Sequence, residues 1–358
     1  MSILDNRQAM KKLDKGNCLD SILSLPKQCE SAWSGVKNLS LPEDYSNARV
    51  IVFSGMGGSA YGARIVKSLY PAELTVPVDI VNGYYLPNYV DENSLVFVAS
   101  YSGSTEETLS CIDDGIKKNL KMIGISSGGK LAEKLKETNR PCYVFDPVYN
   151  PSLQPRLGQG YMQIGQIAIL SALGYLKISD DEITTVLNEL ESRNRLIGPE
   201  TPESSNIAKQ IAKTCESKTV ILIGAEFLEG AIHSIRNPFH ETGKHFADYF
   251  ILPEANHHLL EGLMFPETNQ KNLLFLLVHS NLYSPRIEKR YQLTKEVIGK
   301  NNISIQEIEL KSPTRLGQTF ELIQLGSFIT FYLAMLHNTD PAKIPWVDYF
   351  KQQLAKSK

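Results

Sequence analysis

Short runs of valine, isoleucine and other apolar residues alternate with helical stretches along most of this chain. The first runs span residues 50–53, 78–81, 95–99, 122–125 and 142–145, and helical patterns cover 59–70, 105–118 and 129–137. Strands that are apolar on both faces need helices on each side of their sheet. The pattern therefore predicts a buried, parallel, doubly wound α/β sheet.

The same pattern begins again later in the chain. After a proline-rich loop (Pro147, Pro151, Pro155) and a helix from about 160 to 175, strands are expected at 219–224, 272–278 and 303–310, with helices over 285–299 and 316–337. We expect a helical segment over 1–45, one α/β subdomain over 46–177, a polar helical bridge over 178–217 and a second subdomain over 218–358. Two halves of similar size suggest a distant internal duplication.

Composition narrows the classes of partner. The 358 residues are 42% hydrophobic and 21% charged, with a formal net charge of −2, which argues against nucleic acid or an anionic membrane as the main partner. The chain has no uninterrupted apolar run of 18 residues and no signal-peptide pattern at its start, so we expect a cytoplasmic protein. Its five cysteines form no CxxC pair, which is typical of reduced structural thiols.

Two glycine- and hydroxyl-rich loops follow predicted strands and precede predicted helices. They are Gly55-Met56-Gly57-Gly58-Ser59 and Ser100-Tyr101-Ser102-Gly103-Ser104-Thr105. In a parallel sheet, both fall at the carboxyl ends of strands, where ligands bind. Helix N-termini attract anions, glycine permits close approach of the backbone, and hydroxyl groups add hydrogen-bond donors. Together these features predict a phosphate site.

Two other interpretations of these loops have to be weighed. Ser104 could simply cap the helix that contains Glu106 and Glu107. The first loop also matches a dinucleotide fingerprint of the form GxGxxA. The next predicted strand ends at Val81 and Asn82, with no acidic residue placed for a ribose, so a dinucleotide is the weaker interpretation.

Four motifs, in this order, resemble the sugar isomerase (SIS) domain family, and specifically its short bifunctional phosphoglucose/phosphomannose isomerase branch. They are 55–59, 100–108, Pro155-Arg156-Leu157-Gly158-Gln159-Gly160-Tyr161 and Leu252-Pro253-Glu254-Ala255-Asn256-His257, followed by a terminal Tyr349-Phe350-Lys351. The resemblance spans about residues 50 to 351. It implies two SIS subdomains, hexose 6-phosphate substrates and a place in glycolysis and gluconeogenesis.

The resemblance also implies roles for individual residues. It places the catalytic base at Glu241, sixteen residues before the motif histidine His257, and catalytic roles at Arg156 and Lys351. The substrate contacts it implies are Gly57, Gly58, Ser59, Ser100, Ser102, Thr105 and Arg156, with Ser104 as a cap or peripheral donor. Two positions depart from the family: Thr242 stands where Asn is more common, and His258 doubles His257.

Aldose–ketose isomerisation supports these assignments chemically. It moves a proton between C1 and C2 of an open-chain sugar, so it needs a carboxylate base, a cation beside the developing enediolate, and an acid–base pair for ring opening. Glu241, Arg156, His257 and Lys351 would supply these groups, with no metal and no cofactor. The histidines lack an HExxH pattern, which argues against a zinc-dependent isomerase of another fold.

The family resemblance further implies a homodimer in which the histidine crosses the subunit interface. Three alternatives remain open from sequence: a SIS-type regulator that binds a sugar phosphate without catalysis, an isomerase that accepts glucose 6-phosphate but not its mannose epimer, and an aminating isomerase. The last carries a glutaminase domain with a catalytic cysteine, for which this chain has no matching region.

Overall fold

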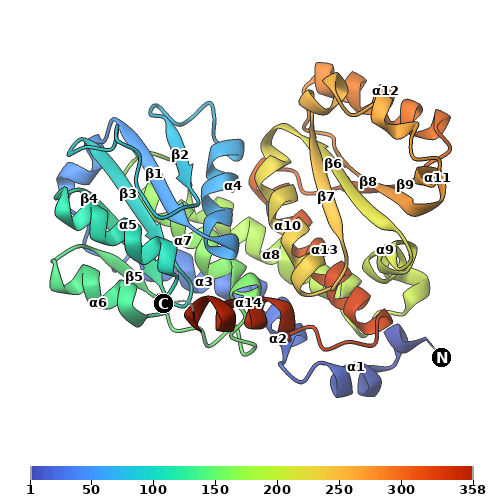
Figure 1. The fold of residues 1–358 in the computed structure, drawn as a ribbon, viewed down its shortest axis with the longest axis horizontal. Helices are drawn as coiled ribbons and strands as arrows, with labels where there is room; N and C mark the ends of the chain where they lie inside the picture. The colour runs from blue at the N-terminus through green and yellow to red at the C-terminus, as the bar shows by residue number, and fades with distance from the viewer. Residues whose placement is uncertain (1, 357–358) are drawn as a thin grey trace.

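Two parallel sheets, each with helices on both faces, form the two halves of the molecule (Figure 1). The computed structural model describes residues 2–356. The first sheet has the order β2-β1-β3-β4-β5 and the second the order β7-β6-β8-β9, and every strand pair is parallel. The predicted fold class, two doubly wound α/β halves, is confirmed.

The first sheet is buried on both faces, as its apolar strands predict. Its strands are β1 (Val50–Gly55), β2 (Val78–Val81), β3 (Ser94–Ala99), β4 (Lys121–Ser126) and β5 (Cys142–Val144). Side chains alternate between faces along each strand. Ile51, Phe53, Leu95 and Phe97 join the core on one side, whereas Val52, Val96 and Val98 join a separate cluster on the other.

The helices of the first half are α4 (Tyr61–Leu69), α5 (Glu106–Lys117), α6 (Gly129–Glu137) and α7 (Gln159–Ala172). Helices α5 and α6 cover the smaller cluster, and α4 and α7 cover the other face. All four lie within a few residues of their predicted ranges. The Pro-rich loop before α7 contains one 3₁₀ turn, η4 (Pro155–Leu157).

The second half contains β6 (Thr219–Ala225), β7 (Ala247–Leu252), β8 (Leu273–Ser280) and β9 (Ser304–Leu310). Its helices are α9 (Ile207–Cys215), α10 (Glu229–Glu241), α11 (Asn269–Asn272), α12 (Pro285–Lys300) and α13 (Arg315–Leu336), and α14 (Pro345–Lys356) follows. Helix α10 and strand β7 were not predicted from the sequence. Helix α13 is long and apolar enough to cross a membrane by length and composition, but 94% of its apolar window is buried inside the protein.

The N-terminal segment connects the two halves. It comprises η1 (Ile3–Asp5), α1 (Arg7–Leu13), α2 (Cys18–Leu23), α3 (Leu25–Val36) and η2 (Glu43–Asn47). Helix α3 packs on α7 of the first half, whereas η1 and α2 contact α13 of the second. Helix α8 (Asp180–Ile197) packs against both α3 and α13. Both connecting segments, described over residues 2–45 and 178–217, pack against the two halves that they join. The predicted domain boundaries therefore stay a prediction.

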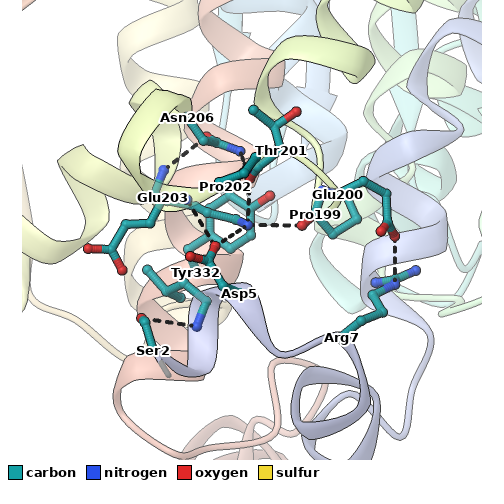
Figure 2. A network of polar contacts seen from close by, with 12 residues as sticks. Ser2, Asp5, Arg7, Pro199, Glu200, Thr201, Pro202, Glu203, Asn206 and Tyr332 are labelled. Atoms are coloured by element: carbon teal, nitrogen blue, oxygen red, sulfur yellow. Dashed lines mark hydrogen bonds and ion pairs between the residues drawn. The ribbon is translucent and has the colours of Figure 1, made fainter.

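The first residues are anchored to the second half by a buried lysine. Lys209 of α9 has no exposed surface, and its Nζ donates to Asp5 Oδ1 at 3.1 Å and to the carbonyls of Pro199 at 2.9 Å and Thr201 at 2.7 Å. Figure 2 shows Asp5 directly below the loop that contains Pro199 and Thr201, with Tyr332 beside it. The Lys209 Nζ lies 5.6 Å from the centre of the Tyr332 ring. The buried charge of Lys209 thus anchors η1 at Asp5 to the second half.

Candidate active site

The two hydroxyl-rich loops meet where the direction of winding changes in the first sheet. The chain passes from β1 outward to β2 and then returns across β1 to β3, so β1 and β3 are neighbours with a switch point between them. Their last residues, Gly55 and Ala99, are paired. In doubly wound sheets, ligands bind in the crevice at such a point. The predicted phosphate loops therefore lie at the expected position for a ligand.

The first loop depends on glycine for its shape. Gly57 has φ +50°, a conformation that residues with a Cβ adopt rarely. A Cβ on Gly58 would lie 3.3 Å from the carbonyl oxygen of Pro155, so the loop passes close to η4. Ser59 is buried, and its Oγ accepts the backbone N–H of Tyr101 at 3.0 Å. That bond joins the first loop to the second.

The hydroxyl groups of the second loop form two pairs. Ser100 Oγ and Thr105 Oγ1 are 2.7 Å apart, and Ser102 Oγ and Ser104 Oγ are 2.9 Å apart. Ser100 has no exposed surface, whereas Ser102 is exposed and Thr105 is partly exposed. Hydroxyl hydrogens rotate freely enough to point at an incoming anion. Ser102 and Thr105 are thus the accessible donors, and Ser100 lies behind Thr105.

Of the two roles expected for Ser104, helix cap or peripheral donor, the structure contradicts the cap. Thr105 is the N-cap of α5, and its side chain accepts no backbone N–H of that helix. The Ser104 hydroxyl pairs with Ser102 instead, because the turn at Gly103 (φ +66°) directs residues 102 and 104 to the same side. The side chain of the N-cap Thr105 makes no hydrogen bond to α5, and the N-terminus of the helix directly follows the loop. This arrangement is favourable for binding an anion.

Arg156, in η4 beside the first loop, is almost completely buried, with 2% of its surface exposed. All five of its N–H groups lie within hydrogen-bond distance of protein acceptors. Nε donates to Thr242 Oγ1 at 3.0 Å, Nη1 to Gln154 Oε1 at 2.8 Å and to Glu241 Oε2 at 3.4 Å, and Nη2 to the carbonyls of Pro341 at 2.7 Å and Ala342 at 2.9 Å. A guanidinium has five such donors, so Arg156 joins the first half to α10 and to the segment before α14.

Helix α10 positions Glu241 at this point. The helix packs against α4, and a Cβ on Gly230 would lie 2.5 Å from the backbone of Ile65, so the two helices are in close contact. Glu241 is the last residue of α10, and its side chain is 35% exposed beside the buried guanidinium of Arg156. The structure thus brings together a carboxylate, a fixed cation and the phosphate loops, all within one protomer.

The other two predicted catalytic residues lie apart from this cluster. His257 ends η7 (Glu254–His257), beyond the carboxyl end of β7, and is exposed. Glu241 lies at the opposite end of β7, because the neighbouring His240 Nε2 contacts the carbonyl of Ala247 at 2.7 Å. Six residues of strand separate the two ends by roughly 16 Å. Lys351 is exposed on α14, which crosses beneath the first half in Figure 1.

Comparison with known proteins places this arrangement in a family. Residues 204–354 match the family model described as the bacterial phospho-glucose isomerase C-terminal SIS domain. A bifunctional phosphoglucose/phosphomannose isomerase from Caldicellulosiruptor bescii is 31% identical over 344 residues, which cover 95% of this chain and 99% of the relative. The chain belongs to the bifunctional phosphoglucose/phosphomannose isomerase family. It is a sugar-phosphate isomerase.

Further comparisons agree with this assignment. A bifunctional phosphoglucose/phosphomannose isomerase from Thermoplasma acidophilum is 28% identical to this isomerase over 306 residues, which cover 85% of this chain and 89% of the relative. Among solved structures, a hypothetical protein from Thermus thermophilus superposes with a TM-score of 0.76 over 99% of this chain and 93% of its own. That protein is only 15% identical, so the likeness concerns the fold alone.

Three residues that surround the Arg156–Glu241 pair of the isomerase were not predicted. Thr242 accepts from Arg156, Gln154 accepts from the same guanidinium, and Lys244 Nζ donates to the carbonyl of Glu241 at 2.7 Å. Thr242 was noted only as a departure from the family's Asn. Both side chains carry an acceptor oxygen, so the exchange keeps an acceptor available for Arg156 Nε.

A hollow of about 940 Å³ lies elsewhere in the isomerase, between α8, α9, β9 and α13. The residues that line it include none of the predicted site residues. Its buried Glu321 already pairs with Arg193 and accepts the backbone N–H groups of Lys311 and Ser312. Because Arg193 and these two N–H groups already contact Glu321, they are less available to bind a phosphate than the hydroxyl groups of the loops at the switch point.

Proposed function

We propose that this isomerase interconverts glucose 6-phosphate and fructose 6-phosphate, and also mannose 6-phosphate and fructose 6-phosphate. The observation that carries the proposal is the position of Glu241. Its carboxylate oxygen lies 3.4 Å from Nη1 of the buried Arg156. Arg156 in turn lies beside the first of the two proposed phosphate loops. The names of the relatives support the same pair of substrates.

In this proposal the phosphate group binds at the N-terminus of α5. Ser102 and Thr105 donate hydroxyl hydrogen bonds, Ser100 orients Thr105, and the backbone of Gly57, Gly58 and Ser59 forms the opposite wall. A helix N-terminus stabilises a phosphate through its free N–H groups and its partial positive charge. The anchored phosphate would hold C1 and C2 of the open-chain sugar toward Glu241.

Glu241 then acts as the base. Its carboxylate takes the proton from C2 of the aldose, which leaves a cis-enediolate. A proton moves from O2 to O1 by way of solvent or a neighbouring group, and Glu241 returns its proton to C1, giving the ketose with no net gain or loss of protons. All five N–H groups of Arg156 already have protein acceptors, so Arg156 stabilises the enediolate through its fixed positive charge as negative charge develops, and not through a free donor.

One base can serve both epimers. C2 of the enediolate is planar, so rotation about the C2–C3 bond before reprotonation presents either face to Glu241. Return of the proton to one face gives glucose 6-phosphate and to the other gives mannose 6-phosphate. A rigid Arg156, held by five hydrogen bonds, keeps the base in place while the sugar turns.

Ring opening requires a second group, and we assign it to His257 of the partner subunit, with Lys351 assisting. Within one protomer the roughly 16 Å length of β7 separates Glu241 from His257. In an isologous dimer, the exposed η7 loop of each subunit could reach the site of the other, so that each site would contain Glu241 from one chain and a histidine from its partner. His257 is the better candidate of the two adjacent histidines, since the ring of His258 packs 5.8 Å from that of Phe250.

The substrates are tested by incubating the purified protein with fructose 6-phosphate and measuring glucose 6-phosphate and mannose 6-phosphate separately. Both products are expected, because the planar enediolate can be reprotonated on either face. Formation of glucose 6-phosphate alone would restrict the proposal to one epimer. Absence of both products, in protein that is folded by circular dichroism, would contradict the proposed substrates.

Mixing two inactive variants tests the shared site. Glu241→Gln and His257→Ala should each be inactive alone, but a mixed dimer would contain one site with both native residues. After unfolding and refolding together, about a quarter of the wild-type activity should return, because half of the dimers are mixed and each has one intact site. If both residues acted within one chain, the mixture would stay as inactive as its components, and the crossed arrangement would be wrong.

A further inference from the structure

Two cations enclose the backbone that leads into the C-terminal helix. Arg156 Nη2 and Lys244 Nζ both donate to the carbonyl of Pro341, at 2.7 and 3.2 Å, and Arg156 also reaches Ala342 at 2.9 Å. We call this group of four residues the clamp. Helix α14, with Lys351 in its second turn, begins three residues after Ala342.

Lys244 also holds the helix that carries the base. Its Nζ donates to the carbonyl of Glu241 at 2.7 Å and to that of Thr242 at 3.4 Å. The last carbonyls of a helix lack partners within the helix, and a lysine can supply one. A single side chain thus contacts both the end of α10 and the connection to α14.

From these contacts, and on the basis of the proposed function, we infer that Lys244 is a positioning residue for the isomerase reaction. It fixes the end of α10 that bears Glu241 against the connection that leads to Lys351. Displacing either end would change the distance between the base and the group that assists ring opening. A misplacement of about 1 Å in an active site can cost roughly 10²-fold in rate.

The backbone at Lys244 supports this role. Its φ of +52° lies in the left-handed region, which is unfavourable for a residue with a long side chain and in which glycine or asparagine is commoner. The three carbonyl groups that Lys244 contacts account for a lysine at this position. A glycine would adopt the turn more easily but would leave the Pro341 carbonyl with Arg156 alone.

The charges around Lys244 make its contribution dependent on pH. Arg156 of η4, Glu241 of α10, Asp340 of the connection and Cys18 of α2 all act on it, and His240, His245 and Lys343 line the adjoining hollow of about 680 Å³. Burial, and secondarily the positive charge of Arg156, lower the pKa of Lys244 to about 8. Above that pH the amine is neutral, and its hydrogen bonds to the carbonyls weaken.

The test compares Lys244→Met and Lys244→Arg across pH 6.5 to 9.5, with fructose 6-phosphate as substrate. Lys244→Met should lower kcat by about 10- to 100-fold with KM changed less than about threefold, since the phosphate loops are untouched. The wild type should lose activity with an inflection near pH 8. Lys244→Arg should recover most of the rate at pH 7 and shift that inflection upward, because a guanidinium stays charged.

Lys343→Met is the matched control. Lys343 is exposed and lines the same hollow, so its substitution removes one nearby charge without touching the clamp, and kcat should be unchanged. An inflection near pH 8 that persists in both Lys244 variants would overturn the inference, as would a Lys244→Met enzyme with wild-type kcat. Neither result would affect the proposed function, which requires only that the wild-type protein converts fructose 6-phosphate.

Discussion

Glu241→Gln is expected to lower kcat by about 10²- to 10⁴-fold while KM for fructose 6-phosphate changes less than about threefold. Glutamine has nearly the same shape, and its amide oxygen can still accept from Arg156 Nη1, which lies 3.4 Å from Glu241 Oε2. It cannot take a proton from C2. Steady-state kinetics, together with incorporation of solvent deuterium at C1 or C2, measures the loss directly.

A matched control lies on the same helix. Glu229, the first residue of α10, is exposed at the far end of the helix from Glu241. Glu229→Gln removes the same charge but should retain wild-type kcat. If Glu241→Gln kept kcat within threefold of the wild type, another group would be the base. A loss of thermal stability in Glu241→Gln would identify the effect as structural, and a loss of activity without it would identify it as chemical.

Much of the architecture could be predicted from the sequence because it depends on local patterns. Apolar runs indicated eight of the strands, and α6 lies at its predicted residues. Helix α10 and strand β7 were missed. Pro238 lies in the last turn of α10, where a proline ordinarily signals a break, and β7 is a partly exposed edge strand interrupted by Asp248. Local signals are weakest at such positions.

Some features of the candidate site could likewise be predicted from the sequence, and others could not. The position of the two hydroxyl-rich loops after β1 and β3 was predictable, because glycine and hydroxyl residues after a strand carry a local signature. Phosphate binding by these loops stays a prediction. Glu241 and Arg156 followed from family resemblance. The carbonyls of Pro341 and Ala342, which accept from Arg156 across 185 and 186 residues of sequence, were not predictable. Every residue type has a backbone carbonyl, so the sequence contains no sign of which one a buried cation will reach.

Lys209→Met is expected to lower the free energy of unfolding by about 3 kcal/mol. The Lys209 side chain is fully buried, and its loss removes the ammonium donor from the carbonyls of Pro199 and Thr201 and from the carboxylate of Asp5. Asp5 keeps the backbone N–H of Glu203, and the Thr201 carbonyl keeps Asn206 Nδ2 at 3.5 Å. A buried ion pair adds little compared with an apolar pair, but removal of one partner is costly. Asp5 is 32% exposed, so water can compensate part of the loss. Urea unfolding monitored by circular dichroism measures the change.

Lys213→Met is the control, because Lys213 lies one turn later on α9 and pairs with Glu203 at the surface, with 60% of its side chain exposed. Its loss should destabilise the protein much less than the loss of Lys209, because water solvates an exposed ion pair. Equal destabilisation by the two substitutions would mean that α9 tolerates neither change and that the buried contacts of Lys209 carry no particular weight.

The stabilising effect of the contact between Asp5 and Lys209 should depend on pH, and it should decrease as the solution becomes more acidic. Burial raises the pKa of Asp5, but hydrogen bonds from Lys209 and from the backbone of Glu203 outweigh this effect and hold the pKa below its ordinary value. Asp5 therefore stabilises the fold above its unfolded pKa of about 4, and this contribution is lost as the pH falls through the lower folded value. The stability difference between the wild type and Asp5→Asn should be constant from pH 5 to 7 and shrink below pH 4. A difference that grew toward acid would mean that Asp5 is protonated more readily in the folded protein, contrary to its contacts with Lys209.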